Sequence, residues 1–217
     1  MSPDFEGHTF SDNNLINGRM NFDCNSVPEG DKTKCTNNAG LSKFKFKAGK
    51  THRLRFINSG SQGVERISID EHTMTVIAND FVEVKPYDTK VVTIGTGQRV
   101  DVVVKADGDP KSTYWLRSNL TSCSSAKQPY ALAAIYYNEA DTEMIPTSTP
   151  WDVPDPGTCA NDDLSITEPF YPIELPEPSW TETRNIGIYR NETRSLLWTF
   201  GVSVLNFEKL MCSLSEL

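Results

Sequence analysis

Apolar and polar residues alternate along most of the first two thirds of the chain. Phe44 and Phe46 alternate with lysines, and Leu54 and Phe56 alternate with arginines. Because successive side chains of a strand point to opposite faces of a sheet, this period of two predicts strands with one buried face. The strands predicted from such runs cover residues 15–22, 43–47, 51–57, 67–69, 74–78, 81–84, 91–94, 100–104, 113–119 and 130–138.

Short polar segments separate these runs and are predicted to be turns or loops. The clearest are a loop at residues 58–63, a turn at 70–72, and a turn at 85–88 that contains a proline. No segment has helical periodicity over more than a turn. The predicted fold is therefore all-β, an antiparallel Greek-key β-sandwich or barrel that covers residues 14–140.

The chain changes character on both sides of this domain. Residues 1–13 are polar and are predicted to be disordered or extended. Eight prolines fall between Pro146 and Pro178, so residues 141–178 are predicted to be a proline-rich linker or a surface strap without a core of its own. Strand-like alternation resumes in residues 179–200. Two strands cannot bury a separate core, so residues 179–217 are expected to be the incomplete start of another domain.

Charge and composition exclude two classes of partner. The chain has 217 residues and a net charge of −8, and nucleic-acid binding depends on lysines and arginines that neutralise phosphates. No apolar run approaches the roughly 20 residues that span a bilayer. We therefore expect neither nucleic acid nor a membrane as partner. The N-terminus has no basic start followed by an apolar core, so no signal peptide is expected in this chain.

The five cysteines indicate an oxidising compartment. Cys24 and Cys35 enclose a short polar segment, and Cys123 and Cys159 enclose the last predicted strand and the start of the proline-rich region. Neither pair has the spacing of a metal site, so we predict the disulfides Cys24–Cys35 and Cys123–Cys159, while Cys212 is left over. The alternative is that all five are free thiols of a cytosolic protein.

Two N-glycosylation sequons favour secretion over a cytosolic location. They begin at Asn119 and Asn191, next to predicted strands where exposed loops are expected. Because such sequons arise often by chance, they only support the argument from the cysteines.

Four ordered motifs at consistent spacing resemble one family. The motifs are LING at 15–18, KTHRLRFINSGS at 50–61, SIDEHTMTVIANDF at 68–81 and GQRVDVVV at 97–104. On these motifs the chain is similar to the second, middle cupredoxin domain of laccase-like multicopper oxidases of the ascomycete type, from residue 14 to residue 200 and not beyond. The resemblance implies a cupredoxin-like fold, with residues 179–217 as the truncated start of a third cupredoxin domain.

The resemblance also implies where copper would be bound in a parent enzyme. In that family the ligands lie in the first and third cupredoxin domains, as His-x-His and His-Cys-His segments, because the blue copper site needs a thiolate with two imidazoles. This chain contains neither segment, and His8, His52 and His72 are isolated. We expect no copper in this chain. His52 is expected to be a partly buried packing residue, and His72 to hydrogen-bond backbone groups in its turn.

One loop of the middle domain is expected to touch substrate. In the family, the loop after the RLRxIN strand often supplies an acidic residue to the wall of the phenol pocket, and the matching position here is Gln62. An amide can hydrogen-bond a hydroxyl but cannot take its proton. Gln62 is thus either a substrate-pocket wall or simply a polar loop residue. Glu65 could compensate, although its place in the alternation favours a solvated strand edge.

Two functions of different classes remain from the sequence. The first is a copper-free middle domain of a laccase-like enzyme, with the first and third cupredoxin domains as partners. That parent enzyme would oxidise phenol-type substrates and reduce O₂ to water. The chain alone is then predicted to be non-catalytic, with no catalytic residue or metal ligand. The second is a free-standing secreted β-sandwich that acts as a binding or scaffold module. The apolar residues of the segment 196–217 favour the first, as part of a fragment.

Overall fold

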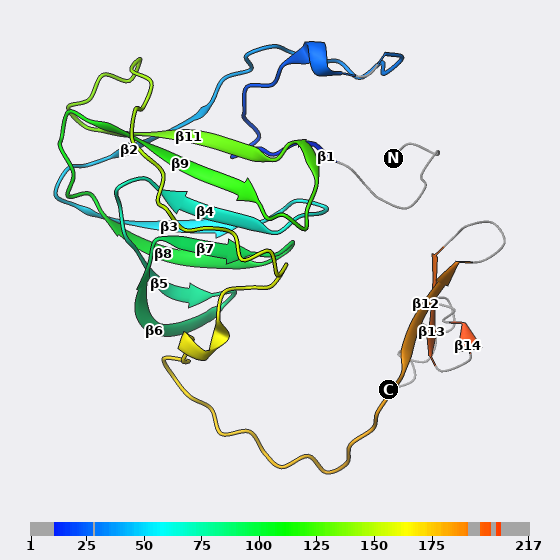
Figure 1. The fold of residues 1–217 in the computed structure, drawn as a ribbon. Coiled ribbons are helices and arrows are strands. Elements are labelled where there is room, and N and C mark those ends of the chain that lie inside the picture. Colours follow the sequence, from blue (N-terminus) through cyan, green and yellow to red (C-terminus); the bar gives the residue numbers. More distant parts are fainter. Residues whose placement is uncertain (1–10, 28, 191–195, 201–202, 205–217) are drawn as a thin grey trace, which may run out of the picture. The chain divides into compact units, whose positions relative to one another are not determined.

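The computed structural model describes residues 11–27, 29–190, 196–200 and 203–204 (Figure 1). The chain forms two compact units, residues 1–172 and residues 173–217. Apart from two single-turn 3-10 helices, η1 (Cys24–Ser26) and η2 (Leu164–Ile166), the described elements are strands. No described helix is long and apolar enough to cross a membrane.

The first unit is a two-layered β-sandwich, which confirms the predicted all-β fold (Figure 1). One layer is a five-stranded sheet with the order β2 (Ser42–Phe46), β11 (Tyr130–Tyr137), β9 (Thr113–Leu120), β4 (Glu65–Ile69) and β7 (Val91–Ile94). The other is a four-stranded sheet with the order β3 (Thr51–Ile57), β8 (Arg99–Lys105), β5 (Met74–Asn79) and β6 (Val82–Thr89). A short parallel pair, β1 (Ser11–Asn13) with β10 (Ala126–Gln128), lies outside both sheets.

The chain passes repeatedly from one layer to the other, so the core is built from strands that are distant in sequence. Within the two sheets all neighbours are antiparallel except β2 and β11, which are parallel. The core between the sheets contains fully buried side chains of Ile69, Met74, Val102 and Ile135. Each such apolar side chain contributes roughly 1.5–3 kcal/mol relative to an exposed one.

The strand predicted at residues 15–22 is wrong. Asn17 and Gly18 have positive φ angles of 50° and 72°, and Ile16 and Arg19 exchange backbone hydrogen bonds of 3.2 and 3.1 Å across them. An Asn-Gly pair favours such a tight turn because both residues tolerate the left-handed conformation. The segment therefore reverses direction at the point where a strand was expected to continue.

The turn predicted at residues 85–88 is also wrong, because β6 continues through it. The register of β5 against β6 shifts between Val76 and Ala78, which places Pro86 beside a bulge. β6 is an edge strand, and a proline without an amide N–H is tolerated at such a position.

The proline-rich region is a strap on the sandwich over residues 144–170, the second of the two structures that the sequence left open. Lys85 N donates to Glu168 O at 2.8 Å, and Phe170 N donates to Glu83 O at 2.8 Å, along the outer edge of β6. Trp151 Nε1 donates to Ile69 O at 2.9 Å at the end of β4. This strap, drawn in yellow in Figure 1, thus covers strand edges that would otherwise be open to solvent.

A buried ion pair connects the strap to the five-stranded sheet. Asp70 is fully buried, and its two carboxylate oxygens accept hydrogen bonds of 2.8 Å from Nε and Nη2 of Arg117 on β9. Ser148 Oγ on the strap donates to the same carboxylate at 2.8 Å and accepts from Trp115 N at 3.0 Å. The sequence placed Asp70 in a turn but did not predict this role.

Both predicted disulfides are confirmed. Cys24–Cys35 closes the loop that contains η1, with a Cα–Cα distance of 5.8 Å. Cys123–Cys159 joins the segment between β9 and β10 to the strap, with a Cα–Cα distance of 5.5 Å. Each typically contributes about 2–4 kcal/mol. Cys212 lies outside the described residues.

The second unit contains a small antiparallel sheet. β12 (Ile186–Arg190) pairs with β13 (Leu196–Phe200), which pairs with β14 (Ser203–Val204). The strand pattern that the sequence showed after residue 179 is therefore present.

The disulfides predict a thiol count. With five cysteines and four of them paired, we expect one thiol per chain to react under denaturing, non-reducing conditions, and five after reduction. Titration with a chromogenic thiol reagent measures both numbers. Five reactive thiols before reduction would contradict the pairing.

The buried ion pair predicts a large effect on stability. Asp70→Ala leaves the Arg117 guanidinium without its partner and removes the anchor of Ser148, so we expect a loss of about 3–5 kcal/mol in the free energy of unfolding. Asp152→Ala, an exposed position on the same strap, is the control and should change stability by less than about 0.5 kcal/mol. Urea unfolding measures both; equal effects of the two variants would argue against a stabilising role of the pair.

Candidate functional site

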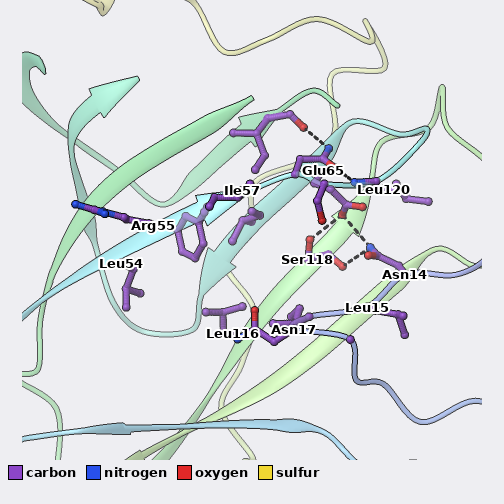
Figure 2. Close-up of a pocket in the computed structure, with 18 of the residues that line it drawn as sticks. Asn14, Leu15, Asn17, Leu54, Arg55, Ile57, Glu65, Leu116, Ser118 and Leu120 are labelled. Atoms are coloured by element: carbon purple, nitrogen blue, oxygen red, sulfur yellow. Dashed lines mark hydrogen bonds between the residues drawn. The ribbon is translucent and has the colours of Figure 1, made fainter. Parts of the chain in front are cut away.

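A cavity of ≈ 620 Å³ lies between the two sheets, beside the edge strands β2 and β3 (Figure 2). Its walls come from residues 13–18, from β3, from the loop 58–62, and from inward-facing residues of β4 and β9. The lining is polar and apolar in about equal parts. The apolar side chains deepest in it are Phe46, Ile67, Ile94, Leu116 and Ile135.

The cavity exists because the two sides of the sandwich are closed differently. On the β6 and β7 side the strap covers the edge, and Asp162 Oδ2 accepts from Thr93 N of β7 at 2.8 Å. On the other side the segment 13–18 lines the opening. The inward side chains Leu54 and Phe56 of β3 are consequently only partly buried.

Glu65, at the start of β4, points into this cavity (Figure 2). Its Oε2 accepts from Asn14 Nδ2 at 2.8 Å and from Ser118 Oγ at 2.7 Å, and Asn14 Nδ2 also donates to Ser118 O at 3.2 Å. Burial raises the pKa of the Glu65 carboxyl, and these two hydrogen bonds from Ser118 and Asn14 lower it only in part. The solvated position expected from the alternation is wrong, since Glu65 lies on the same face of β4 as the buried Ile67 and Ile69.

Gln62 lies in the wall of the same cavity. Its loop is held by Asn58, whose Nδ2 donates to Gly63 O at 3.0 Å and to Ile94 O at 3.1 Å, and whose Oδ1 accepts from Gly60 N at 3.0 Å. Gln62 Oε1 is buried without a hydrogen-bond partner among the described residues. The structure thus brings Gln62 and Glu65, the two residues that the sequence singled out in this region, to one cavity.

Sequence reasoning did not predict Asn14 and Ser118 as parts of this site. Ser118 is on the inward face of β9 with Leu116, which alternation along that strand could have indicated. Asn14 is 104 residues from the serine whose carbonyl it contacts, and no local pattern indicates so distant a contact.

The cavity can supply hydrogen-bond acceptors to a bound molecule. Glu65 offers a carboxylate and Gln62 an amide oxygen, and only the carboxylate can take a proton at ordinary pH. The cations in the lining are Arg53 and Arg55 of β3, and both pair with Asp101 of β8. An apolar molecule that carries a hydrogen-bond donor matches these walls.

The two described histidines have structural contacts. The His52 ring stacks on Phe46 at 4.3 Å, and its Nε2 accepts from Lys47 N at 3.0 Å. His72 is buried, with Nδ1 2.7 Å from Asp70 O and Nε2 2.6 Å from Tyr137 Oη. Both histidines thus have the packing and hydrogen-bonding environments that the sequence predicted. His8 lies outside the described residues.

The Tyr137 hydroxyl supports this arrangement of His72. It also accepts from Gly108 N at 3.1 Å, and burial is the main cause that raises the pKa of Tyr137 to about 12. The hydroxyl therefore keeps its proton over the physiological range and can donate it to the unprotonated Nε2 of His72.

Of the two sequon asparagines, Asn119 is exposed on β9, and Asn191 lies outside the described residues. Exposure of Asn119 is compatible with a glycan, and its glycosylation stays a prediction.

Comparisons with known proteins agree on one family. The sequence model of the family described as Multicopper oxidase matches residues 2–140. The chain belongs to the multicopper oxidase family. It is 33% identical to Oxidoreductase OpS5 of Beauveria bassiana, over 89% of this chain and 32% of that protein. It is 34% identical to Laccase-2 of Botryotinia fuckeliana, over 76% of this chain and 27% of that protein.

Solved structures give the same result. The crystal structure of a laccase from Botrytis aclada superposes with a TM-score of 0.76 at 31% identity, over 89% of this chain and 34% of that one. This multicopper oxidase chain therefore spans about a third of the length of the relatives that it matches.

The family implies copper, and the described residues do not fit it. They contain no group of three or more His, Cys, Asp or Glu side chains that could hold a metal ion. The ring nitrogens of His72 and the Nε2 of His52 are already engaged, and four of the five cysteines are in disulfides. A blue copper site needs a free thiolate and two imidazoles together, and the described part of this multicopper oxidase chain offers no such set.

The raised pKa of Glu65 predicts a pH-dependent difference in stability. An acid whose pKa rises on folding binds its proton more tightly in the folded state. Its contribution to the free energy of unfolding is therefore full below its usual pKa of 4.5 and is lost as the pH rises through the folded pKa. Relative to Glu65→Gln, the native protein should lose stability as the pH rises above 4.5, by at most about 1.4 kcal/mol for each unit of pKa shift.

Urea unfolding of both proteins at several pH values from acid to neutral measures this difference. The exposed Glu139→Gln serves as the control, and its difference from the native protein should not change with pH. A difference for Glu65→Gln that is equally constant would refute the raised pKa.

Proposed function

We propose that the chain is the copper-free middle cupredoxin domain of a laccase-like multicopper oxidase. The observation that carries the proposal is a match to laccases over nearly the whole of this chain but only about a third of theirs. In this assignment residues 14–140 form the middle domain, residues 141–178 connect it onward, and residues 179–217 begin a third cupredoxin domain.

The middle domain would be a scaffold and a wall in this enzyme. The first and third domains would bind the copper that oxidises a phenol-type substrate and passes electrons to O₂, which is reduced to water. This domain would hold them in register and contribute Gln62 to the substrate pocket. The engaged histidines His52 and His72 support a role without copper ligation.

We further propose that the parent enzyme is secreted. The two disulfides are the supporting observation, because such bonds persist in oxidising compartments. Glycans at Asn119 and Asn191 would belong to the same assignment.

A free-standing binding module is the second candidate, and the cavity favours it. Its apolar floor, its polar rim and its acceptors Glu65 and Gln62 could hold a small molecule without any neighbouring domain. The two candidates predict different results when the first and third cupredoxin domains of a laccase are joined to this chain.

The first test uses the chain alone. After incubation with Cu²⁺ we expect no intense blue absorption and no turnover of a phenol, since a thiolate with two imidazoles is required for the first and clustered imidazoles for the second. Visible absorption and oxygen uptake measure these properties. A blue preparation that consumes oxygen with a phenol would overturn the proposal.

The second test restores the neighbours. The middle domain of Botrytis aclada laccase is replaced by residues 14–172 of this chain, so that the first and third domains come from the laccase. The chimera should bind copper and absorb in the blue region, whereas replacement by an unrelated β-sandwich should not. A soluble chimera that remains colourless would favour the binding module.

A further inference from the structure

We propose that Tyr137 and His72 form a redox-active pair, in which Tyr137 loses an electron to a small oxidising radical and passes its proton to Nε2 of His72. The class of oxidant rests on the proposed function, because incomplete reduction of O₂ releases radicals of this kind, among them the hydroxyl radical. The pair itself is inferred from the contacts of the two side chains. It gives an oxidising radical that reaches this domain one fixed, buried destination.

The direction of the hydrogen bonds around His72 is the first argument. Nδ1 lies 2.7 Å from Asp70 O, and a backbone carbonyl can only accept, so Nδ1 carries the proton of the neutral ring. Nε2 is then unprotonated and accepts from Tyr137 Oη at 2.6 Å. A phenol that has lost an electron is a strong acid. Its proton therefore crosses this existing hydrogen bond without movement of either ring.

Burial of the pair is the second argument. His72 is 2% exposed and Tyr137 is 0% exposed. Burial is the main cause that raises the pKa of Tyr137 to about 12, so its hydroxyl does not ionise before the electron leaves. The proton must therefore leave with the electron, which requires a base in contact with the hydroxyl. The same burial keeps solvent and other radicals away from the oxidised ring.

The electrons and protons of this step balance. The O–H bond of Tyr137 breaks, an N–H bond forms at Nε2 of His72, and the products are a neutral tyrosyl radical and an imidazolium. The pair thus gains one positive charge, and the hydrogen bond from Nδ1 to Asp70 O becomes stronger because its donor is now charged. A hydroxyl radical that takes the electron becomes hydroxide, which a solvent proton converts to water.

The other tyrosines with described side chains lack such a base. Tyr136 Oη donates to Met144 O at 3.0 Å, and a backbone carbonyl cannot keep a proton at ordinary pH. Tyr114 is also buried, with its ring centroid 5.3 Å from that of Tyr137, but its Oη accepts from Asp109 N at 3.1 Å and donates to no base among the described residues. Tyr114 is therefore the matched control for Tyr137.

Trp151 connects the pair to the surface. Its Nε1 donates to Ile69 O at 2.9 Å and to His72 O at 3.3 Å, and its ring on the strap is partly exposed. An indole ring gives up an electron readily, so a radical in solvent oxidises Trp151 first. The Lys90 ammonium lies 4.3 Å from the ring centroid and opposes a positive charge on the ring. The electron that Trp151 loses is therefore replaced from Tyr137.

The test generates azide radicals by pulse radiolysis in a solution of the full chain, since this oxidant takes one electron from exposed indole rings. We expect a prompt indolyl-radical absorption and then the growth of a persistent tyrosyl-radical absorption, at a rate that does not depend on protein concentration. The growth should be slower in D₂O, because the proton moves with the electron. This isotope comparison uses the native protein and needs no variant.

Four variants assign the signal to residues. Tyr137→Phe should lose the persistent tyrosyl absorption, and the control Tyr114→Phe should keep it. His72→Gln supplies an amide that cannot take a proton, so it should lose the signal although Tyr137 is present. Trp151→Phe should slow the growth of the signal. Urea unfolding shows which variants are folded, and only folded variants are compared.

Three results would overturn the inference: no persistent tyrosyl absorption in the native protein, a signal that survives Tyr137→Phe or His72→Gln, or growth that is equally fast in D₂O. The chimera tests the proposed function separately. A blue chimera together with a native chain that forms no persistent tyrosyl radical would refute only the redox-active pair. A colourless chimera together with the expected radiolysis result would refute only the proposed function.

Discussion

The buried ion pair between Asp70 and Arg117 connects three parts of the first unit that are distant in sequence. Asp70 directly follows β4, Arg117 lies on β9, and Ser148 lies on the strap and donates to the same carboxylate. A fully buried carboxylate is tolerated only when its charge and its lone pairs are satisfied. The strap must therefore be in place for this end of the sandwich to be stable. Trp151 and the disulfide Cys123–Cys159 attach the strap further along its course.

The same strap explains why the cavity lies on the opposite side of the sandwich. Where the strap follows β6 and β7, its residues hydrogen-bond to the strand edges and cover them. Beside β2 and β3 there is no such cover among the described residues, and the inner faces of Leu54 and Phe56 remain accessible. Glu65 lies in this opening, so its carboxylate is neither fully solvated nor paired with a cation. A carboxylate and the unpaired amide oxygen of Gln62 in one partly apolar opening make this side of the domain a candidate for ligand binding.

Membership of the multicopper oxidase family and the lack of fit to copper are consistent with each other. The sandwich resembles that of a laccase closely, yet the imidazoles of His52 and His72 serve packing and hydrogen bonding. Most of the fold was predictable from alternation, because a period of two depends on local geometry alone. The errors at Asn17 and Pro86 arose where turn chemistry or a bulge outweighs alternation. Of the site, the sequence indicated Gln62 but misjudged Glu65.

By itself the sequence determined the all-β class, most of the strands, both disulfide pairings, the family and the scarcity of histidines. These follow from periodicity, from cysteine spacing and from motifs that are contiguous in the chain. Only the tertiary structure decided that the proline-rich region is a strap, that Asp70 is paired, and that Glu65 faces a cavity with Asn14 and Ser118. Each of these depends on contacts between residues from about 30 to more than 100 positions apart, which the packing of two sheets creates and no local pattern encodes.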